Sequence, residues 1–469
     1  MKIRKLYFKK HKVFNDHEIV FFDEKNSIPK ITYLVGNNGS GKTHILESIY
    51  FSLSQPFSNG AEEYDIDLEL ELDNKETIEL AIVDGHELSY SITKGVSNNA
   101  HNIKTKNKVN TYDGSLIQKI SKVVYSTVEI NFTTPAIQNV TSKNLDEQEN
   151  PKDKSTNLGT EIPQLLVDIQ ALDNAEKGGW VDKVEQESKD NPILVPHGSF
   201  TNRLKRFTSV FDKIFDGQKK FKGIETKNNQ KHIVFTDTNG NDTGIPDLSS
   251  GEKQIIFRIG YILKNLVNIK GGIILIDEPE ISLHPMWQTK FKETLLEVFD
   301  GLDVQIIIAT HSPYIFKHLD ETKERCIKVS GKEKNSKEVK LSYKNMFLSP
   351  SVNLISYKAF GVYDEMLHSE LYCLLQSFTQ RSKIDCRNSG TDCGKCLEHL
   401  FLQSPNVSRK TFIGSVPFNM DKVNGSPLSL TETLPTLIRN KTHHSDEINR
   451  VYSKVELKEA IDYLLSHFT

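Results

Sequence analysis

The order of apolar and polar positions predicts an α/β fold with two kinds of sheet. Largely apolar runs at 31–35, 273–276 and 305–309 are typical of parallel strands buried on both faces. Strict alternation from Ile66 to Ile92 instead predicts an antiparallel sheet with one solvated face. The pattern therefore indicates a parallel-sheet core that carries an antiparallel β-subdomain.

Shorter patterns complete this picture. Further strands are expected at 2–9, 18–22, 122–126, 326–329 and 339–341. Apolar positions at helical spacing, first from Leu165 to Leu172 and then from Leu204 to Phe215, predict a helical insertion at about 140–215. From about 346 the pattern becomes mainly helical. We therefore expect an α/β domain at 1–345 and a helical C-terminal region at 346–469.

Composition narrows the class of protein without specifying its chemistry. The 469 residues carry a net charge of −3, which argues against polyanion binding through bulk charge. Five cysteines do not make a disulfide scaffold in so long a chain, which favours a reducing cytoplasm. The N-terminus lacks the apolar core of a signal peptide, and no apolar run is long enough to span a bilayer. We therefore expect a cytoplasmic protein without membrane spans.

A glycine-rich turn carries the clearest chemical signal. It lies between the strand at 31–35 and a predicted helix at 44–50, and it fits the phosphate-binding loop G-x-x-x-x-G-K-[ST] at every fixed position. Its residues are Gly36, Asn37, Asn38, Gly39, Ser40, Gly41, Lys42 and Thr43. The backbone N–H groups would surround phosphate oxygens at the positive end of the helix. Lys42 would reach the β- and γ-phosphates of ATP, and Thr43 would ligate Mg²⁺.

Two carboxylates follow the apolar run at 273–276. Asp277 is predicted to hold Mg²⁺ through water, and Glu278 to orient and polarise the attacking water as a general base. Taken alone, the pair is also explained by a strand that ends in two solvated acids. Its meaning depends on the motifs around it.

Three more motifs, one before the carboxylate pair and two after it, occur in the order found in one enzyme family. The segment Leu248-Ser249-Ser250-Gly251-Glu252, before an apolar helix, resembles the signature motif of ABC-type ATPases, although it also fits a simple Ser N-cap. Segment 279–285 resembles the D-loop of that family, and His311 after the strand at 305–309 resembles its switch histidine. Over about residues 1–345, the chain therefore resembles an ABC-type ATPase head.

This resemblance implies a homodimer, or a higher assembly of dimers, that binds ATP and Mg²⁺ between subunits. Ser249, Ser250, Gly251 and Glu252 would grip the γ-phosphate of the nucleotide held by the other subunit, and His311 would sense that phosphate. In the family a glutamine between the two halves of the head completes the metal shell. Gln138 is the candidate here, with Gln118 and Gln164 as alternatives. Hydrolysis would then separate the two heads.

The C-terminal region carries a second resemblance. Segments 350–361 and 434–444 are similar to the PtuA ATPases of Septu antiviral systems, including the retron-associated members. The resemblance implies an HNH-type nuclease partner of the PtuB kind, and in the retron form a reverse transcriptase and retron nucleic acid. It further implies that the ATP state gates a nuclease acting on invader DNA or host RNA.

Residues 439–444 allow two interpretations. Arg439, Asn440 and His444 fit R-N-x-x-x-H, the motif of HEPN ribonucleases, in which the His acts as acid or base and the Arg steadies the phosphate. The same residues also fit a polar helix face that docks a partner, which is the favoured interpretation. The spacing R-x4-H alone is a weak signal in a chain of this length.

A cysteine cluster also has two interpretations. Cys386, Cys393, Cys396 and His399 are spaced C-x6-C-x2-C-x2-H, which could form a tetrahedral zinc knuckle. The first gap is longer than the usual spacing, so free cytoplasmic thiols in a loop are the alternative. The sequence leaves a Zn²⁺ cofactor open.

The motifs together favour an ATP hydrolase of bacterial anti-phage defence over two other classes of protein. A recombination or DNA-repair ATPase without toxic output would be indicated by long arms or a zinc hook, and neither is evident in the sequence. A regulatory scaffold that only binds nucleotide would be indicated by replacement of Glu278, which is intact. An ATPase that controls a nuclease is therefore the expected function.

Overall fold

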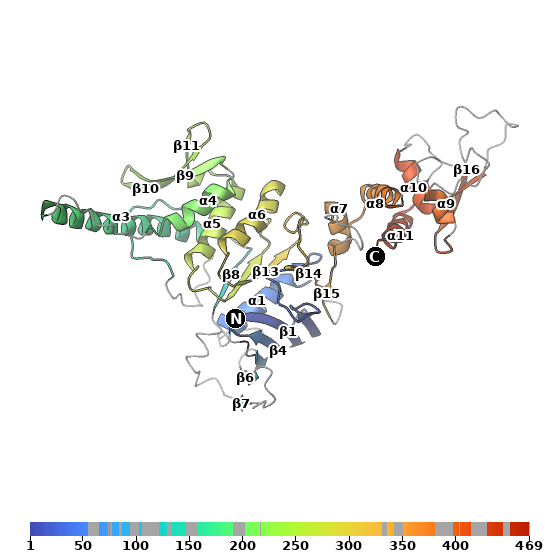
Figure 1. Ribbon diagram of the computed structural model, residues 1–469, viewed down its shortest axis with the longest axis horizontal. Helices are drawn as coiled ribbons and strands as arrows, with labels where there is room; N and C mark the ends of the chain where they lie inside the picture. The colour runs from blue at the N-terminus through green and yellow to red at the C-terminus, as the bar shows by residue number, and fades with distance from the viewer. Residues whose placement is uncertain are drawn as a thin grey trace. The chain divides into compact units, whose positions relative to one another are not determined.

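The chain forms two compact units, Met1–Lys340 and Leu341–Thr469. The structure is a computed structural model, and Figure 1 shows its elements in chain order. It describes residues 1–54, 65–73, 75, 77–83, 87–93, 103–105, 122–128, 134–146, 157–190, 202–215, 217–330, 335–341, 350–379, 397–402, 404–413, 429–443 and 451–468.

A parallel sheet forms the centre of the first unit. Its strand order is β15-β14-β3-β13-β12-β8, and every neighbouring pair is parallel except β14 with β15. The strands are β3 (Ile31–Val35), β8 (Val123–Ser126), β12 (Ile273–Asp277), β13 (Gln305–Thr310), β14 (Glu324–Lys328) and β15 (Lys337–Glu338). All residues of β3, β12 and β13 are buried, as their apolar runs predict.

An antiparallel sheet packs against this core. Its order is β2-β1-β4-β5-β6-β7. The strands are β1 (Lys2–Lys10), β2 (Asn15–Val20), β4 (Asp65–Glu71), β5 (Thr77–Val83), β6 (Glu87–Thr93) and β7 (Ile103–Thr105). One hydrophobic core includes residues of both sheets and of α1 (Lys42–Ser54), so the two sheets and this helix form one folding unit.

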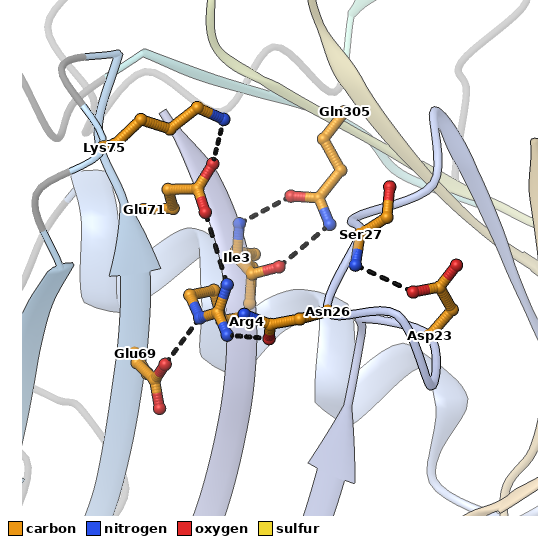
Figure 2. A network of polar contacts seen from close by, with 9 residues as sticks. All are labelled: Ile3, Arg4, Asp23, Asn26, Ser27, Glu69, Glu71, Lys75 and Gln305. Carbon is orange, nitrogen blue, oxygen red and sulfur yellow. Dashed lines mark hydrogen bonds and ion pairs between the residues drawn. The ribbon is translucent and has the colours of Figure 1, made fainter. Parts of the chain in front are cut away.

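Polar contacts also join the two sheets (Figure 2). The buried Gln305 side chain of β13 accepts a hydrogen bond from Ile3 N at 2.6 Å and donates one to Ile3 O at 3.1 Å. On the other side of β1, Arg4 pairs with Glu69 at 2.7 Å and Glu71 at 3.3 Å. Because Gln305 satisfies both backbone groups of Ile3, the edge of β1 is held in register with the parallel sheet.

Helices surround the sheets of the first unit. They are α3 (Leu158–Asp190), α4 (Lys205–Ile214), α5 (Ser250–Lys264) and α6 (Pro285–Val298), with a single 3₁₀ turn at Ile245–Asp247 before α5. An ion pair between Lys264 of α5 and Glu161 of α3 joins the inner end of the long α3 helix to the core. A three-stranded sheet, in the order β11-β10-β9, follows α4 and was not predicted; it consists of β9 (Lys219–Lys227), β10 (Gln230–Asp237) and β11 (Asp242–Gly244).

The second unit is mainly helical, with one hairpin. Its apolar core is formed mostly by residues of its helices, among them Leu371 and Ile461. The elements are α7 (Val352–Ile355), continued as one π-helical turn at Ser356–Phe360, then α8 (Glu365–Phe378), α9 (Leu397–Leu402), β16 (Arg409–Ile413), β17 (Ser429–Thr433), α10 (Leu434–His443) and α11 (Lys454–Leu465). The β16–β17 hairpin was not expected from the sequence.

The predicted fold class, a parallel core with an antiparallel β-subdomain, is confirmed by these sheets. The strand expected at 339–341 is wrong: the pairing is at Lys337–Glu338, and Val339 only donates its N–H to Cys326 O at 2.8 Å. Across the part of the chain described above, no helix combines the length and apolar character needed to cross a membrane.

Candidate active site

The carboxyl ends of three parallel strands meet at one edge of the central sheet. Asp277 pairs with Ala309, Ala309 pairs with Leu34, and Thr310 pairs with Val35. Because the strands are parallel and in this register, the residues that follow them emerge together. Gly36, Glu278 and His311 therefore come from distant parts of the sequence to one edge, where ligands of open α/β sheets bind.

The phosphate-binding loop closes tightly between β3 and α1. Gly36, Gly39 and Gly41 all have positive φ angles, at 152°, 74° and 99°. A Cβ at Gly41 would lie 2.3 Å from the ring of Phe14, so no larger residue fits between the loop and the segment that precedes β2. Residues 37–39 are exposed and Ser40 is half-buried, ahead of a helix that begins at Lys42. This arrangement places exposed backbone amides at a helix N-terminus, as an anion site requires.

Lys42 is folded against the loop. Its Nζ donates to Gly36 O at 3.0 Å and to Asn37 O at 3.3 Å, and it lies 3.5 Å from His311 Nδ1. Burial lowers the pKa of Lys42 to about 8, although the charges of Glu278 and Asp277 act in the opposite direction. Lys42 Nζ also lies 3.5 Å from the Ser40 hydroxyl. A lysine whose cation is costly to bury, and whose partners are carbonyl oxygens, a hydroxyl and an imidazole, is suited to bind an anion.

Asp277 is the buried carboxylate at the end of β12. Its Oδ2 accepts a hydrogen bond from the Tyr125 hydroxyl at 3.3 Å, whereas its Oδ1 is buried and has no hydrogen-bond partner among the described residues. Burial raises the pKa of Asp277 to about 6, which the Thr43 hydroxyl partly offsets. Thr43 and Asp277 thus face each other across the site, as expected of two ligands of one metal ion.

Glu278 and His311 form a second contact across the site. The Glu278 Oε1 lies 3.1 Å from His311 Nε2. Since the Lys42 ammonium can only donate, His311 Nδ1 accepts from it, and Nε2 carries the proton that is donated to Glu278. Burial and then the Lys42 charge lower the pKa of His311, so the neutral ring is favoured.

The backbone at Glu278 is in an unusual conformation. Its φ is 42°, in the left-handed region that non-glycine residues seldom adopt, and its N–H donates to Ala309 O at 2.9 Å. Ser282, four residues later, has a φ of 63°. Strained backbone of this kind persists where surrounding contacts hold it, and it is concentrated at functional sites.

Residues outside the predicted set hold the segment after Glu278. Glu280 is half-buried, and its Oε1 accepts a hydrogen bond from His311 N at 2.5 Å. Gln288 of α6 donates to Leu283 O at 2.8 Å and accepts from the Ser312 hydroxyl at 2.5 Å. The sequence signal for these residues was only their nearness to known motifs, since nothing in the pattern indicates which of them point inward.

The segment at 248–252 opens helix α5 with a capping box. Ser249 is the N-cap: its Oγ accepts from Glu252 N at 3.3 Å, while Ser249 N donates to Glu252 Oε2 at 2.8 Å. Burial tends to raise the pKa of Glu252, but the ion pair with Lys219 at 2.6 Å and the Ser249 bonds outweigh it, so the pKa is lowered. Ser249 is therefore the N-cap of α5, as the simpler interpretation of the motif predicted. Ser249 and Ser250 are exposed at the start of this helix.

Gly251 sets the distance between this helix and the segment after Glu278. A Cβ at Gly251 would lie 2.5 Å from Ser282 O and 3.4 Å from the Trp287 ring. Only glycine allows so close an approach of the two backbones. The first turn of α5 and the 279–285 segment are thus in direct contact within one chain.

These residues fit a magnesium-bound nucleoside triphosphate. The loop amides and Lys42 suit phosphate oxygens, and the unpartnered Asp277 Oδ1 beside Thr43 suits a hard cation that prefers oxygen ligands. No group of three or more His, Cys, Asp or Glu side chains able to hold a metal by themselves occurs in the described ranges. A metal here would therefore share its ligands with the nucleotide and water, as Mg²⁺ does.

The structure gives no hydrogen bond or ion pair between this edge and some of the other predicted site residues, and further ones lie outside the described residues. Gln138 is exposed and follows Ile137, which bridges to Lys231 of β10. Gln164 on α3 donates to Asn139 O at 3.0 Å and to Asp168, and Gln118 lies outside the described residues. No contact given by the structure joins Gln138 to the nucleotide site.

The C-terminal candidates are described only in part. Cys386, Cys393 and Cys396 lie outside the described residues, and so does the side chain of His399 on α9. Arg439 and Asn440 lie on α10, where the buried Asn440 Oδ1 accepts a hydrogen bond from Arg439 Nη1 at 2.8 Å. His444 lies outside the described residues, so the structure gives no distance from Arg439 or Asn440 to His444.

Comparison with known proteins shows to which family the chain belongs. Residues 31–317 match the family described as "AAA domain, putative AbiEii toxin, Type IV TA system". The chain is 25% identical to the "Retron Vc95 probable ATPase" of Vibrio cholerae serotype O1 biovar El Tor, over 78% of this chain and 81% of that protein. It is 26% identical to the "Septu protein PtuA" of Bacillus thuringiensis, over 61% of this chain and 67% of that protein.

Among solved structures, the SMC head domain from Thermotoga maritima is similar, with 18% identity over 73% of this chain and 100% of that chain and a TM-score of 0.35. The resemblance to Septu and retron ATPases that the motifs indicated is confirmed by the two sequence relatives. Since the family match spans more than half of the sequence, the chain belongs to the family described as "AAA domain, putative AbiEii toxin, Type IV TA system", and it is an ATP hydrolase.

Proposed function

We propose that this chain is the ATPase subunit of a bacterial anti-phage defence system, in which ATP binding and hydrolysis control an associated nuclease. The observation that carries the proposal is the extent of the similarity to the retron ATPase. It covers 78% of the chain, whereas the first unit ends at Lys340 of 469 residues. The similarity therefore reaches into the second unit and is not a property of the ATP site alone.

The geometry of the first unit supports ATP hydrolysis by a general-base route. The loop amides and Lys42 would bind the phosphates, and Thr43 with Asp277 would hold Mg²⁺, which would neutralise charge on the phosphate oxygens. Glu278 would orient the attacking water and accept its proton. His311 holds the Glu278 carboxylate in place through Nε2, so the base is oriented before the nucleotide is bound.

A homodimer, or a higher assembly of dimers, would complete each site. The start of α5 is suited to contact the γ-phosphate of nucleotide bound by another protomer, with Ser249 and Ser250 exposed and Gly251 and Glu252 buried behind them. Because Gly251 is in close contact with Ser282, a movement of the start of α5 would also move the segment after Glu278. Separation of the protomers after hydrolysis would be the mechanical output.

The second unit would dock the nuclease, for which an HNH-type partner of the PtuB kind is the candidate. Asn440 is buried and bonded to Arg439, which suits a residue that shapes α10 more than one that contacts a scissile phosphate. A docking face around 439–444 is therefore favoured over an RNase site. Retron nucleic acid and a reverse transcriptase would be further partners in an operon of the retron type.

The test uses the double variant Arg439→Ala, His444→Ala with the candidate partner co-expressed. If the segment is a docking face, the variant loses partner co-purification and phage protection while its ATP turnover stays at the wild-type rate. Lys220→Ala, an exposed charge on β9 far along the sequence, is the matched control. An RNase site would instead leave co-purification intact and give RNA cleavage that persists in EDTA.

Full phage protection by the double variant would contradict both interpretations of the segment. The wider proposal fails if Lys42→Ala, which removes the phosphate-binding lysine, protects cells as well as wild type does. That result would favour a scaffold or a repair-type ATPase without toxic output.

A further inference from the structure

The carboxylate of Asp277 presents its two oxygens to different surroundings. Oδ2 accepts a hydrogen bond from Tyr125 of β8 at 3.3 Å, and Oδ1 is buried without a partner in the described part of the chain. Tyr125 lies directly beside Asp277 because β8 pairs with β12, with Tyr125 opposite Leu275. A buried, unpartnered carboxylate oxygen is costly unless a ligand satisfies it, so the hydroxyl decides which oxygen remains available.

The main chain of Asp277 is held from another element. Arg258 of α5 is fully buried, and its Nη1 donates to Asp277 O at 2.7 Å and to Ser126 O at 3.5 Å. One guanidinium thus joins the ends of β12 and β8, the two strands that carry Asp277 and Tyr125. It reaches them from the helix whose first turn contains Ser249–Glu252.

Arg258 has no other role visible among the described residues. Its Nε and Nη2 are buried and have no hydrogen-bond partner in the described ranges. Burial lowers the pKa of Arg258 to about 10, and the charge of Asp277 is the largest influence acting the other way, followed by Glu280. A buried guanidinium with two unpaired nitrogens would be strongly unfavourable in an apolar helix without these carboxylates beside it.

We propose that Tyr125 and Arg258 are positioning residues that aim Asp277 Oδ1 at the metal of the nucleotide site. Tyr125 occupies Oδ2 and fixes the rotation of the carboxylate, and Arg258 fixes the main chain from which it projects. The inference rests on the proposed magnesium-dependent hydrolysis, and it adds two residues from outside the sequence motifs. Outer contacts of this kind orient metal ligands, and their loss typically weakens metal binding about 10- to 100-fold.

The experiment separates metal binding from nucleotide binding in the full-length protein. A fluorescent ATP analogue is titrated first in EDTA and then at rising Mg²⁺ concentration. For Tyr125→Phe, which removes only the hydroxyl, we expect the Mg²⁺ concentration at half-maximal effect to rise about tenfold while affinity in EDTA is unchanged. Tyr33→Phe is the matched control, since Tyr33 is also buried in this sheet and its hydroxyl has no hydrogen-bond partner in the described ranges.

Arg258 is tested by two variants and by chemical unfolding. Arg258→Lys keeps the charge but cannot reach both carbonyl oxygens, so we expect a smaller rise in the Mg²⁺ requirement than in Arg258→Met. If Arg258→Met does not fold, the Mg²⁺ requirement of Arg258→Lys alone tests the role of Arg258. Equilibrium unfolding in urea confirms that each variant compared is folded.

Each outcome has one meaning. An unchanged Mg²⁺ requirement in folded Tyr125→Phe and Arg258→Lys would overturn the inference and make both residues ordinary core contacts. Equal loss of binding with and without Mg²⁺ would also overturn it, because that result indicates a distorted loop. Failure of the proposed function is distinguished separately: wild-type protein would then bind no nucleotide, or Lys42→Ala would bind it normally.

Discussion

Two regions of this chain bury ionisable side chains, and they do so for different reasons. At the edge of the parallel sheet, burial raises the pKa of Asp277 to about 6, and charged groups from other elements converge on it. In the second unit, burial lowers the pKa of His368 to about 3, although the Pro435 carbonyl acts in the opposite direction. Neither ring nitrogen of His368 has a hydrogen-bond partner in the described ranges.

The comparison shows which feature indicates a catalytic site. A shifted pKa reports burial in both regions, so the shift alone does not discriminate between them. The nucleotide site differs because opposite charges arrive from β12, α1 and α5, and because the Thr43 hydroxyl at the end of the phosphate-binding loop lies near its buried carboxylate. His368 instead lies on α8 within a helical core, next to Leu367 and close to the ring of Tyr372 at 6.1 Å.

The largest expected effect tests the nucleotide side of this comparison. Glu278→Gln removes the general base and leaves the phosphate-binding loop intact, so ATP hydrolysis should fall about 10²- to 10⁴-fold while ATP binding is retained. Phosphate release and nucleotide titration measure the two quantities. Glu297→Gln, an exposed acid on α6, is the control. Turnover at the wild-type rate in Glu278→Gln would remove Glu278 from the mechanism.

A metal site at the cysteine cluster would change the comparison, because the second unit would then also contain a site that binds a ligand. If Cys386, Cys393, Cys396 and His399 bind zinc, purified protein should carry about one zinc per chain. Cys393→Ser with Cys396→Ser should then remove the metal, and Cys373→Ser, an exposed free thiol on α8, should not. Elemental analysis that finds no zinc in the wild type would identify the cluster as free thiols.

A third prediction concerns the nucleotide site and tests whether one protomer alone can form a complete site for ATP hydrolysis. Lys42→Ala and Ser249→Arg should each be inactive alone. Mixed in equal amounts under exchange, half of the dimers would combine both variants and retain one intact site, so about a quarter of wild-type turnover should return. If no activity returns although mass spectrometry detects mixed dimers, the site is not shared between protomers.

The smallest expected effect tests the second unit. The folded pKa of His368, about 3, lies below the unfolded value of about 6.5. Its contribution is therefore fully present above pH 6.5, and it is lost by up to about 1.4 kcal/mol per pH unit as the pH falls toward 3. His368→Leu should make the stability of the second unit less dependent on pH. Pulse proteolysis in urea, with detection of fragments from residues 341–469, measures this stability.

His467→Asn is the control for that measurement, because His467 is half-buried and its Nδ1 bonds to Tyr463 O at 3.0 Å. If His368→Leu keeps the full acid sensitivity of the wild type, the buried imidazole is not its source.

Sequence reasoning identified the motifs but not the contacts that make them a site. The loop 36–43, the pair Asp277–Glu278 and His311 follow strands whose apolar runs are long enough to recognise, so local pattern sufficed to find them. Tyr125, Arg258 and Gln288 were missed, since each resembles an ordinary core or surface residue in the linear sequence. Glu280 lay in the D-loop segment, but no role was predicted for it. The sheet β9–β11 was missed because its strands alternate weakly and carry many lysines.

The division between sequence and structure has a physical cause. The sequence by itself determined the strands that carry the motifs and the residue types able to bind phosphate and metal, because these depend on periodicity and on glycine and carboxylates at fixed spacing. Only the tertiary structure decided that Asp277 has one oxygen bonded to Tyr125 and one unpartnered, and that Glu278 faces His311. Those relations join residues 33 to 152 positions apart. They arise from strand register and burial, which local pattern does not encode.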